Sequence, residues 1–245
     1  MPAIAESESS WHCRSCSVGR HARLNHYPRT SGRAALPVSS RSSFRDEVEV
    51  IVAFKGPLDA DASKVRDARP DIRWLHGTRA RGFQLNQGAA CASGRWLWFV
   101  HADSVLPLDW YAAFREVDAI DRVVGGSFAF RLDSAAWQAR VLERGVRWRV
   151  RWLGLPYGDQ GLFVRRSVFD EMGGFADLPL MEDVDFVRRL KPYGVLRHLT
   201  VGLTTSARRW EREGWWTRSA RNLLLLGLYE LGAPPGWLAR RYYRT

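Results

Sequence analysis

An aspartate that follows an apolar run is the first candidate for chemistry in this sequence. Asp103 comes directly after residues 96–101 (WLWFVH), a run typical of a buried strand. In parallel α/β sheets, ligands collect at the carboxyl ends of the strands. A carboxylate at that place can hold a divalent cation against a diphosphate. An aspartate that caps the turn before Pro107 fits the same spacing.

A second group of acids, Glu182, Asp183 and Asp185, stands at the start of a predicted helix. The helix dipole favours acids in a first turn, which is a sufficient structural reason for them. The apolar stretch before them, residues 175–181, favours a place at a cleft wall. A partly buried carboxylate there, Glu182 or Asp183, could accept a proton as a general base.

Basic residues are placed to bind an anion. Residues 77–82 (GTRARG) precede a predicted helix, whose free backbone amides could bind a phosphate together with Arg79 and Arg81. Residues 206–210 (SARRW) put Arg209 beside Trp210. Sugar and phosphate sites often combine a cation with an aromatic surface in this way, although exposed Arg–Trp pairs are also common.

The elements that would position these residues alternate along the chain. Strands are predicted at 48–54, 72–75, 96–101, 123–132, 161–165 and 195–204. Helices are predicted at 82–93, 107–120, 135–153, 182–190, 214–232 and 235–243, with a short one between 167 and the glycines at 173–174. This pattern is typical of an α/β domain with a mostly parallel sheet. We therefore predict one domain over residues 46–245.

Composition limits the class of protein. The chain has 245 residues, 46% of them hydrophobic, so it can bury one sizeable core without disulfides or metal. Its net charge is +11, and all but three of its 37 basic residues are arginines, which favours anionic partners; a genome rich in G and C would give the same bias. Three cysteines exclude a secreted disulfide scaffold and favour a reducing compartment.

Targeting signals are not visible in the sequence. The first 20 residues hold no apolar h-region, and the longest apolar stretch, 223–231, contains Glu230 and is shorter than the ~20 residues of a spanning helix. We expect a cytoplasmic protein.

Residues 1–45 differ from the rest of the chain. They are rich in Ser, Arg and His and show no helical or strand period, so we predict a disordered basic tail. Within it, Cys13, Cys16, His21 and His26 have the spacing of a zinc knuckle. Short tracts of Cys and His also arise by chance, and the sequence leaves bound zinc open.

Four segments in order carry a resemblance to a known family. They are GTRARGFQLNQGAACASGRWLWFVHADSVLP, LPYGDQGLFVRRSVFDEMGGF, PLMEDVDFVRRL and TSARRWEREG. Over roughly residues 48–245 the chain resembles family-2 glycosyltransferases of the GT-A fold, in the branch of radical-SAM/selenodomain-associated transferases. Four motifs in the right order are far more specific than any one of them.

The resemblance implies transfer of a sugar from a nucleotide-sugar donor with a divalent cation, Mn²⁺ or Mg²⁺. Asp103 would bind the metal, as the last residue of a DxD-like triplet in which His101 replaces the first acid. Asp183, with Glu182 beside it, would be the catalytic base. Asp159 and Gln160 would face the acceptor. Residues from the first and the last of the segments would contact the donor: Arg79, Arg81, Asn86, Gly88, His101, Asp103, Arg209 and Trp210. A metal and a base together predict an inverting, single-displacement reaction.

The N-terminal part departs from the family pattern. Family members begin with a strand that ends in Pro-Val-x-Asn-Glu, followed by a helix. Here residues 36–38 (LPV) are followed by serines, and only about nine residues precede the next strand, too few for an ordinary helix of three turns. The strand at 48–54 ends without the acid that meets the nucleotide in the family. We therefore expect the first βα unit to be missing or altered, with residues 33–40 as a substitute strand or an N-terminus that is not native.

Two other functions stay open. A catalytically impaired relative would bind anionic surfaces, membrane or nucleic acid, through its basic helices. Nucleic-acid binding by the basic tail alone is weakly supported. The apolar stripe of the C-terminal helices fits packing against the domain or a second subunit, as a homodimer, or contact with a membrane that carries a lipid-linked acceptor.

Overall fold

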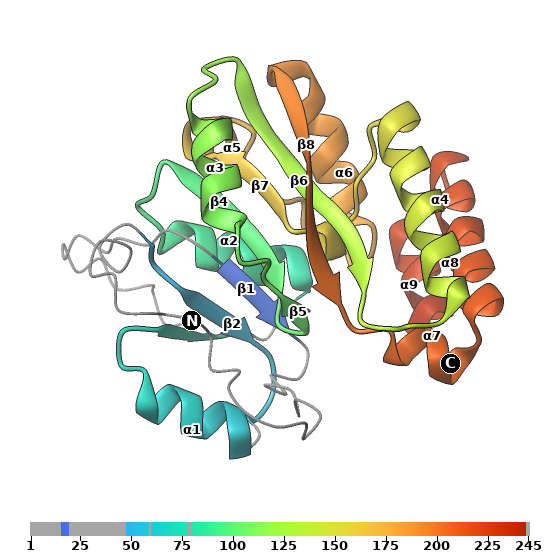
Figure 1. Cartoon of the computed structure of the whole chain (residues 1–245), viewed down its shortest axis with the longest axis horizontal. Helices are drawn as coiled ribbons and strands as arrows, with labels where there is room; N and C mark the ends of the chain where they lie inside the picture. Colours follow the sequence, from blue (N-terminus) through green and yellow to red (C-terminus); the bar gives the residue numbers. More distant parts are fainter. Residues whose placement is uncertain (1–15, 20–47, 59, 78–79, 244–245) are drawn as a thin grey trace.

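The structure is a computed structural model that describes residues 16–19, 48–58, 60–77 and 80–243. Within these residues an eight-stranded sheet is flanked by helices, and its strand order is β3-β2-β1-β4-β7-β6-β8-β5 (Figure 1). The strands are β1 (Cys16–Gly19), β2 (Ile51–Phe54), β3 (Arg73–His76), β4 (Trp96–His101), β5 (Ser104–Val105), β6 (Val123–Leu132), β7 (Leu162–Arg165) and β8 (Val195–Thr205).

Helices connect most of these strands. They are α1 (Ala60–Ala68), α2 (Arg81–Ala90), α3 (Trp110–Asp118), α4 (Trp137–Leu153), α5 (Arg166–Glu171), α6 (Glu182–Leu190), α7 (Arg208–Glu213), α8 (Trp215–Glu230) and α9 (Pro235–Tyr243). Two 3₁₀ turns, η1 (Gly158–Gln160) and η2 (Lys191–Tyr193), complete the set. The predicted alternation of strands and helices from residue 48 onward is confirmed.

The sheet is mixed, with a parallel half and an antiparallel insertion. Strands β3, β2, β1 and β4 pair in parallel, and β6 pairs in parallel with β8. Strand β7 lies between β4 and β6 and is antiparallel to both, and β5 is antiparallel to β8. The α/β class with a mostly parallel sheet, predicted from the apolar runs, is confirmed.

Strand β1 corrects the prediction for the N-terminal segment. Cys16–Gly19 pairs with both β2 and β4 and so takes an interior place in the sheet. The expectation of a tail outside the fold for residues 1–45 is wrong for these four residues. Four residues are too few to show a strand period in the sequence, whereas backbone pairing on both sides is available to almost any sequence. The other tail residues, with Cys13, His21 and His26, lie outside the described part of the chain, as do the expected substitute strand at 33–40 and Arg79.

Two apolar layers hold the helices to the sheet. On one face α2, α5 and α6 pack against β2, β4 and β7, with Phe99, Phe175 and Phe186 at the centre. On the other face α3 packs against β4, β6 and β8, with Trp98 and Phe128 stacked at 4.7 Å between ring centroids. Both faces of β4 are therefore buried, as its continuous apolar run predicts.

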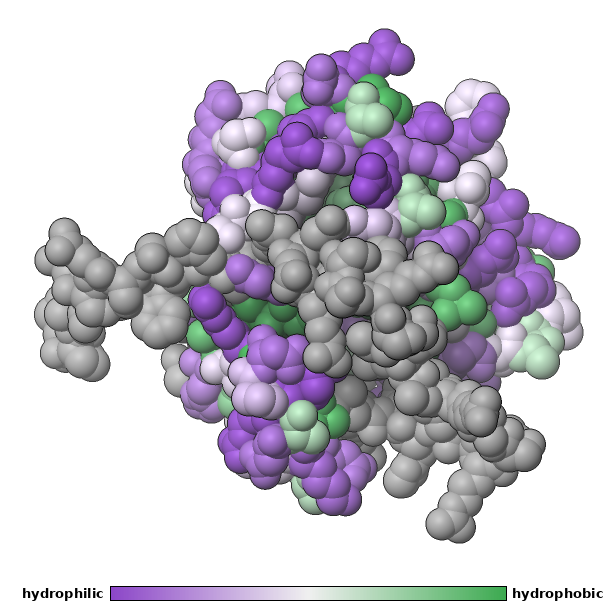
Figure 2. Space-filling view, turned by 60° about the vertical axis from the view of Figure 1, so that its left-hand side comes forward, coloured by the Kyte–Doolittle hydropathy of each residue, from purple (hydrophilic) through white to green (hydrophobic). Residues whose placement is uncertain are grey.

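The C-terminal helices form a separate layer beside β6 and β8. Helices α4, α8 and α9 lie side by side at this edge (Figure 1), and α4 and α7 pack on the end of β6 through Phe130, Leu132 and Ala139. Among the described helices, none combines the length and apolar content that a bilayer crossing requires. Where Figure 2 colours the surface by hydropathy, it is mostly hydrophilic with scattered apolar areas, in keeping with the net charge of +11.

Phe186 offers a test of the core that carries α6. Its ring is fully buried and stacks on Phe175 at 4.1 Å between centroids. We expect Phe186→Ala to lower the free energy of unfolding by about 3–5 kcal/mol, because a large cavity opens under the helix. Urea unfolding measures this loss. Leu108→Ala, at a side chain that is 84% exposed, is the control and should change stability by less than about 0.5 kcal/mol. Equal midpoints for the two variants would contradict this packing.

Candidate active site

Arg81 joins three separate parts of the chain. It is the first residue of α2, and its Nη1 lies 3.2 Å from Oε1 of Glu182, the first residue of α6. Its Nη2 donates a hydrogen bond to Nε2 of His101, the last residue of β4. The end of a strand and the starts of two helices therefore meet at one guanidinium group.

Charges around Arg81 determine the protonation of its partners. Burial lowers the pKa of Arg81, but Glu182, Asp183 and Asp159 raise it overall, so the guanidinium stays charged. Burial, with Arg81 and then Arg209, holds the pKa of His101 well below its usual value. His101 is therefore neutral at neutral pH and accepts the bond from Arg81. Its response to Arg209 also places that arginine near the end of β4.

The two predicted catalytic acids follow a residue in an unusual conformation. Met181 has φ 66°, in the left-handed region that non-glycine residues rarely enter. It turns the chain so that Glu182 is buried against Arg81, while Asp183 faces the η1 turn. Oδ2 of Asp183 accepts the Gly158 N–H at 2.7 Å, and Oδ1 accepts the Val184 N–H at 2.9 Å. Two backbone donors thus fix the orientation of this carboxylate.

The η1 turn fits closely under the helix start. A Cβ on Gly158 would lie 3.3 Å from Oδ2 of Asp183 and closer still to the Arg81 guanidinium. Only a residue without a side chain lets the turn approach both groups.

Asp159 has a strongly raised pKa of about 6. Burial is the main cause, and the charges of Asp183 and Asp103 also raise this pKa, while Arg149 and Arg81 lower it. Its Oδ1 is buried and has no hydrogen-bond partner. The charges of Asp103 and Asp183 both act on Asp159, so the three carboxylates share one region of the molecule. The site that we predicted from distant motifs therefore gathers Asp103, Asp159, Asp183, Arg81 and His101.

Strand β5, which the sequence did not predict, brings a further segment to this region. Ser104 pairs with Thr205 and Val105 with Thr204, so the chain after Asp103 runs against the end of β8. The segment after β8 starts α7 and carries Arg209. Oγ of Ser104 is also buried without a hydrogen-bond partner.

These residues suit a divalent cation that is shared with a diphosphate. Carboxylate oxygens are hard ligands, and Oδ1 of Asp159 is an unused acceptor. In the described part of the chain, no three His, Cys, Asp or Glu side chains already form a metal-binding group. Hard cations such as Mg²⁺ commonly bind through one or two carboxylates and complete their shell with substrate phosphates and water. The site fits that mode of binding and not a preformed protein cage.

Arg149 and Tyr157 belong to the site and were missed from the sequence. The Arg149 guanidinium lies 3.5 Å from the centroid of the Tyr157 ring and donates to Oε1 of Gln160 at 3.2 Å. Burial raises the pKa of Tyr157, and the Asp183 and Asp159 charges add to that increase. The sequence showed Arg149 only as one of several arginines on an amphipathic helix. Its place beside the apolar positions Leu142 and Val146 on the helical wheel was the available signal.

Gln160 has a supporting place and does not face an acceptor. It is 2% exposed; Oε1 accepts the Tyr157 N–H at 3.1 Å as well as Arg149, and Nε2 donates to the Phe128 carbonyl at 3.3 Å. The predicted contact of Gln160 with the acceptor is therefore wrong, because both ends of its amide already form hydrogen bonds inside the protein.

Two predicted donor contacts on α2 also turn out to be structural. Asn86 donates to the Phe175 carbonyl and accepts the Phe175 N–H, both at 2.8 Å, so it clamps α2 to the chain before α6. Gly88 is buried in the same helix, about 10 Å along the axis from Arg81 at 1.5 Å per residue. Neither position is free to contact a donor at the start of the helix.

Trp210 and Arg209 have different surroundings although they are neighbours. The indole N–H of Trp210 donates to Oγ of Ser219 at 3.2 Å, and its ring packs edge-on against Phe130 at 6.1 Å. The Trp210 ring thus packs α7 against β6, and its predicted contact with the donor stays a prediction. Arg209 is exposed and acts on His101.

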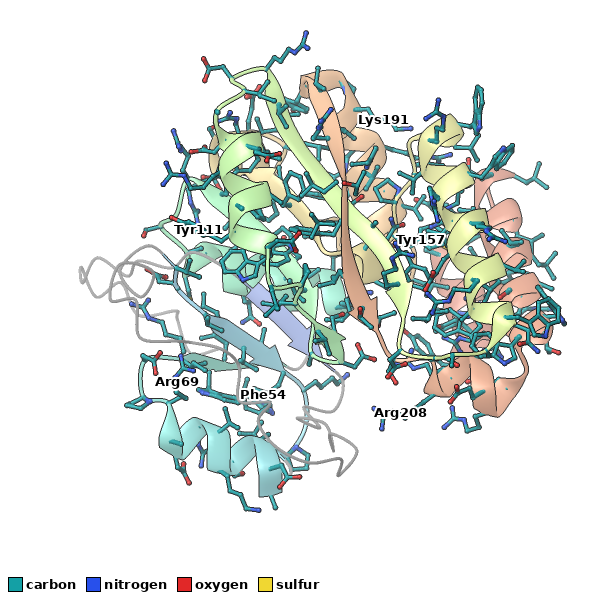
Figure 3. The ribbon with its side chains drawn as sticks, viewed as in Figure 1. Phe54, Arg69, Tyr111, Tyr157, Lys191 and Arg208 are labelled. Carbon is teal, nitrogen blue, oxygen red and sulfur yellow. The ribbon has the colours of Figure 1, made fainter. Side chains whose placement is uncertain are left out.

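A cavity lies at the carboxyl ends of β2 and β3. Its volume is about 590 Å³, and it is lined by Phe54, Gly56, Pro57, Leu58, Ser63, Arg66 and His76. The rings of Phe54 and His76 meet edge to face at 5.3 Å between centroids. Figure 3 shows Phe54 at the end of β2, Tyr157 beside α4, and Arg208, at the start of α7, below Tyr157 at the lower edge of the view.

Comparisons with known proteins agree with this arrangement. A mostly parallel sheet with acids at the strand ends and an arginine at a helix start defines a GT-A-like domain. Residues 37–176 match the sequence model of a family described as "Glycosyl transferase family 2". The match covers more than half of the chain, and the chain belongs to this family. A search of curated protein sequences found no match.

Solved structures show the same fold at low sequence identity. S. aureus TarS 1–349 in complex with UDP-GlcNAc is 11% identical, with a TM-score of 0.54 over 79% of this chain and 58% of that one. The mannosyltransferase PcManGT from Pyrobaculum calidifontis, in complex with GDP-Man and Mn²⁺, is 17% identical, with a TM-score of 0.54 over 94% and 70%. The chain spans 58% to 64% of the TarS 1–349 structures that it matches. The GT-A-like fold expected from the resemblance is confirmed.

Asp159 predicts a distinct pH dependence of stability. The folded protein binds the proton of this carboxyl more tightly than the unfolded chain does, because its pKa is about 6 against an ordinary 3.8. The free energy of unfolding therefore falls as pH rises from 4 to 6, by up to about 3 kcal/mol at 1.36 kcal/mol per pKa unit.

The test compares wild type with Asp159→Asn in urea at pH 4 to 7.5. We expect the variant to be more stable by about 1–3 kcal/mol at pH 7.5 and equal to wild type near pH 4. Asp177→Asn, at an exposed carboxylate, should follow wild type throughout. If the free energy of unfolding changed with pH in the same way for wild type and Asp159→Asn, the raised pKa of Asp159 would be contradicted.

Proposed function

We propose that this protein transfers a sugar from a nucleotide-sugar donor to an acceptor hydroxyl by metal-dependent single displacement with inversion. The observation that carries the proposal is that Asp103 and Asp183 act on Asp159, while Glu182, Asp183 and Asp159 act on Arg81, at the strand ends of a family-2 chain.

Asp103 is the proposed metal ligand, with Oδ1 of Asp159 as a second oxygen. The PcManGT complex holds GDP-Man together with Mn²⁺, which supports a divalent cation in this fold. When bound, such a cation supplies charge that stabilises the departing diphosphate. Arg81 and Arg209 add fixed positive charge beside it, and neutral His101 keeps the Arg81 guanidinium in place.

Asp183 is the proposed general base. It takes the proton of the acceptor hydroxyl as the acceptor oxygen bonds to the anomeric carbon, and the bond from that carbon to the diphosphate breaks. The Gly158 N–H holds the carboxylate in one orientation. Glu182 is paired with Arg81 and acts by positioning it. Asp159, on the same turn as Gly158, is the proposed contact for the acceptor.

The cavity at the ends of β2 and β3 is the proposed place of the nucleoside. Phe54 and His76 offer aromatic surface, and Arg66 offers donors, where the family has an acid. The complexes of the structural neighbours hold UDP-GlcNAc and GDP-Man, so uridine and guanosine donors are the first to examine.

The finer membership, in the radical-SAM/selenodomain-associated branch, rests on the four sequence segments and stays a prediction. The cytoplasmic location and a non-native N-terminus also stay predictions.

A catalytically impaired relative is the second candidate. The observation that favours it is the absence of an acid for the nucleotide at the end of β2, where the sequence is Ala53-Phe54-Lys55-Gly56. Binding measurements and turnover separate the two candidates.

Turnover tests the roles of the acids. With a panel of UDP- and GDP-sugars and Mn²⁺, we expect release of the nucleoside diphosphate by wild type. Asp183→Asn should lower this rate by about 10²–10⁴-fold while the affinity for the nucleoside diphosphate stays within about threefold, since a general base contributes to the rate and not to donor binding. Asp177→Asn is the matched control and should keep the wild-type rate.

Calorimetry with Mn²⁺ and UDP or GDP tests the metal ligand. Asp103→Ala should abolish the gain in nucleotide affinity that Mn²⁺ produces. A protein that binds no nucleotide in the panel, with or without Mn²⁺, would favour the impaired relative. Metal-dependent binding that survives Asp103→Ala would place the cation elsewhere.

A further inference from the structure

Helix α4 presents a row of apolar side chains to solvent. Trp137, Trp148 and Trp152 are 61–67% exposed, and Val141 is exposed between them. At 100° per residue these four positions fall within an arc of about 60° on the helix. Soluble proteins rarely expose large contiguous apolar areas, and such areas mark contact sites. A row of exposed tryptophans on one helix face is therefore unusual.

Helix α8 carries a second apolar row. The exposed side chains are Trp216, Ala220, Leu223, Leu224 and, at the end of the helix, Leu231. The Trp137 and Trp216 rings lie 5.9 Å apart, so the two rows join where the helices begin. Figures 1 and 3 show α4 and α8 side by side, with aromatic side chains along their outer edge. We call the exposed apolar residues of these two helices the α4–α8 surface.

The exposed charges on helix α4 have one sign. Arg144, Arg147 and Arg151 are exposed and have no ion-pair partner among the described residues. The one acid of α4, Glu143, is buried and paired with Arg131 and Arg140. The one acid of α8, Glu230, is paired with Arg188 from α6. Exposed tryptophans and arginines therefore lie together along α4.

We propose that the α4–α8 surface docks on the headgroup region of an anionic lipid bilayer. Tryptophan rings prefer the depth of the headgroups, and arginine binds lipid phosphates through its planar fork. Two helices of 16 and 17 residues lying in the interface plane are typical of peripheral attachment, which buries apolar side chains without crossing the bilayer.

A second copy of the chain is a poorer occupant of the same surface. If two copies met through a two-fold axis, the α4–α8 surface of one copy would face the α4–α8 surface of the other. The exposed arginines of the two α4 helices would then come close to each other. No acid on the exposed side of α4 is available to pair with them. An anionic bilayer supplies the opposite charge that a second copy lacks.

The docking surface and the candidate active site share helix α4. Arg149 lies over Tyr157 at the site, while Trp148 and Trp152 on an adjoining side of the same helix face outward. A docked molecule would therefore hold its site near the membrane surface, where a lipid-borne acceptor is found. The docking itself does not depend on the proposed transfer reaction.

Flotation of the full chain with vesicles tests this proposal. Wild type should float with vesicles of phosphatidylcholine containing about one third phosphatidylglycerol and should stay at the bottom with pure phosphatidylcholine. Trp148→Ser/Trp152→Ser and Leu223→Ser/Leu224→Ser should each weaken binding at least about tenfold. Arg144→Gln/Arg147→Gln/Arg151→Gln should weaken it about a hundredfold, at roughly fivefold per arginine.

Controls keep the outcome unambiguous. Leu108→Ser and Arg115→Gln change an exposed leucine and an exposed arginine away from the α4–α8 surface and should float like wild type. Wild type alone, in low and in high salt, tests the electrostatic part without any variant, and high salt should release it. Wild type that never floats, or variants of the surface that float undiminished, would overturn the proposal. The proposal would also be overturned if wild type did not bind the vesicles and sedimented as a dimer, while Trp148→Ser/Trp152→Ser sedimented as a monomer.

Discussion

The ion pair between Arg81 and Glu182 is the contact on which the candidate site depends. Glu182 is buried, and a buried carboxylate that loses its partner destabilises a protein by about 3–5 kcal/mol. The pair therefore ties the start of α6 to the start of α2, and the bond from Arg81 to His101 adds the end of β4. Once these three ends are held together, Asp183 and Asp103 lie close enough to Asp159 to act on its charge.

Much of the fold could be predicted from the sequence because the long elements carry their own pattern. The predicted bounds of β4, β6, α6 and α9 agree with the structure residue for residue. Each is a mainly apolar strand or an amphipathic helix with clear ends. The sequence missed β1, β5, α1 and α7. The two strands have four and two residues and owe their form to pairing with neighbours, which a local pattern does not record.

The acids of the site were predictable and the amides were not. Asp103 and Asp183 stand at element ends, where position alone indicates chemistry. Asn86 and Gln160 were assigned to substrates, but tertiary partners at Phe175 and Phe128 decide where their side chains point. The same limit applies to Trp210, whose indole turns toward Ser219, and to Arg149, which reaches the site from a helix that also faces solvent. A buried side chain that can both donate and accept hydrogen bonds pairs first with the nearest buried backbone groups, and sequence spacing does not reveal which groups those are.

The most direct test of the account is a crystal structure of the protein with Mn²⁺ and a nucleoside diphosphate, with the metal located by anomalous scattering. We expect one Mn²⁺ in direct contact with the Asp103 carboxylate and the diphosphate, and on the same side of the sheet as Asp183. A metal held by other residues, or a diphosphate bound away from Arg81, would contradict the claim that these acids share one site.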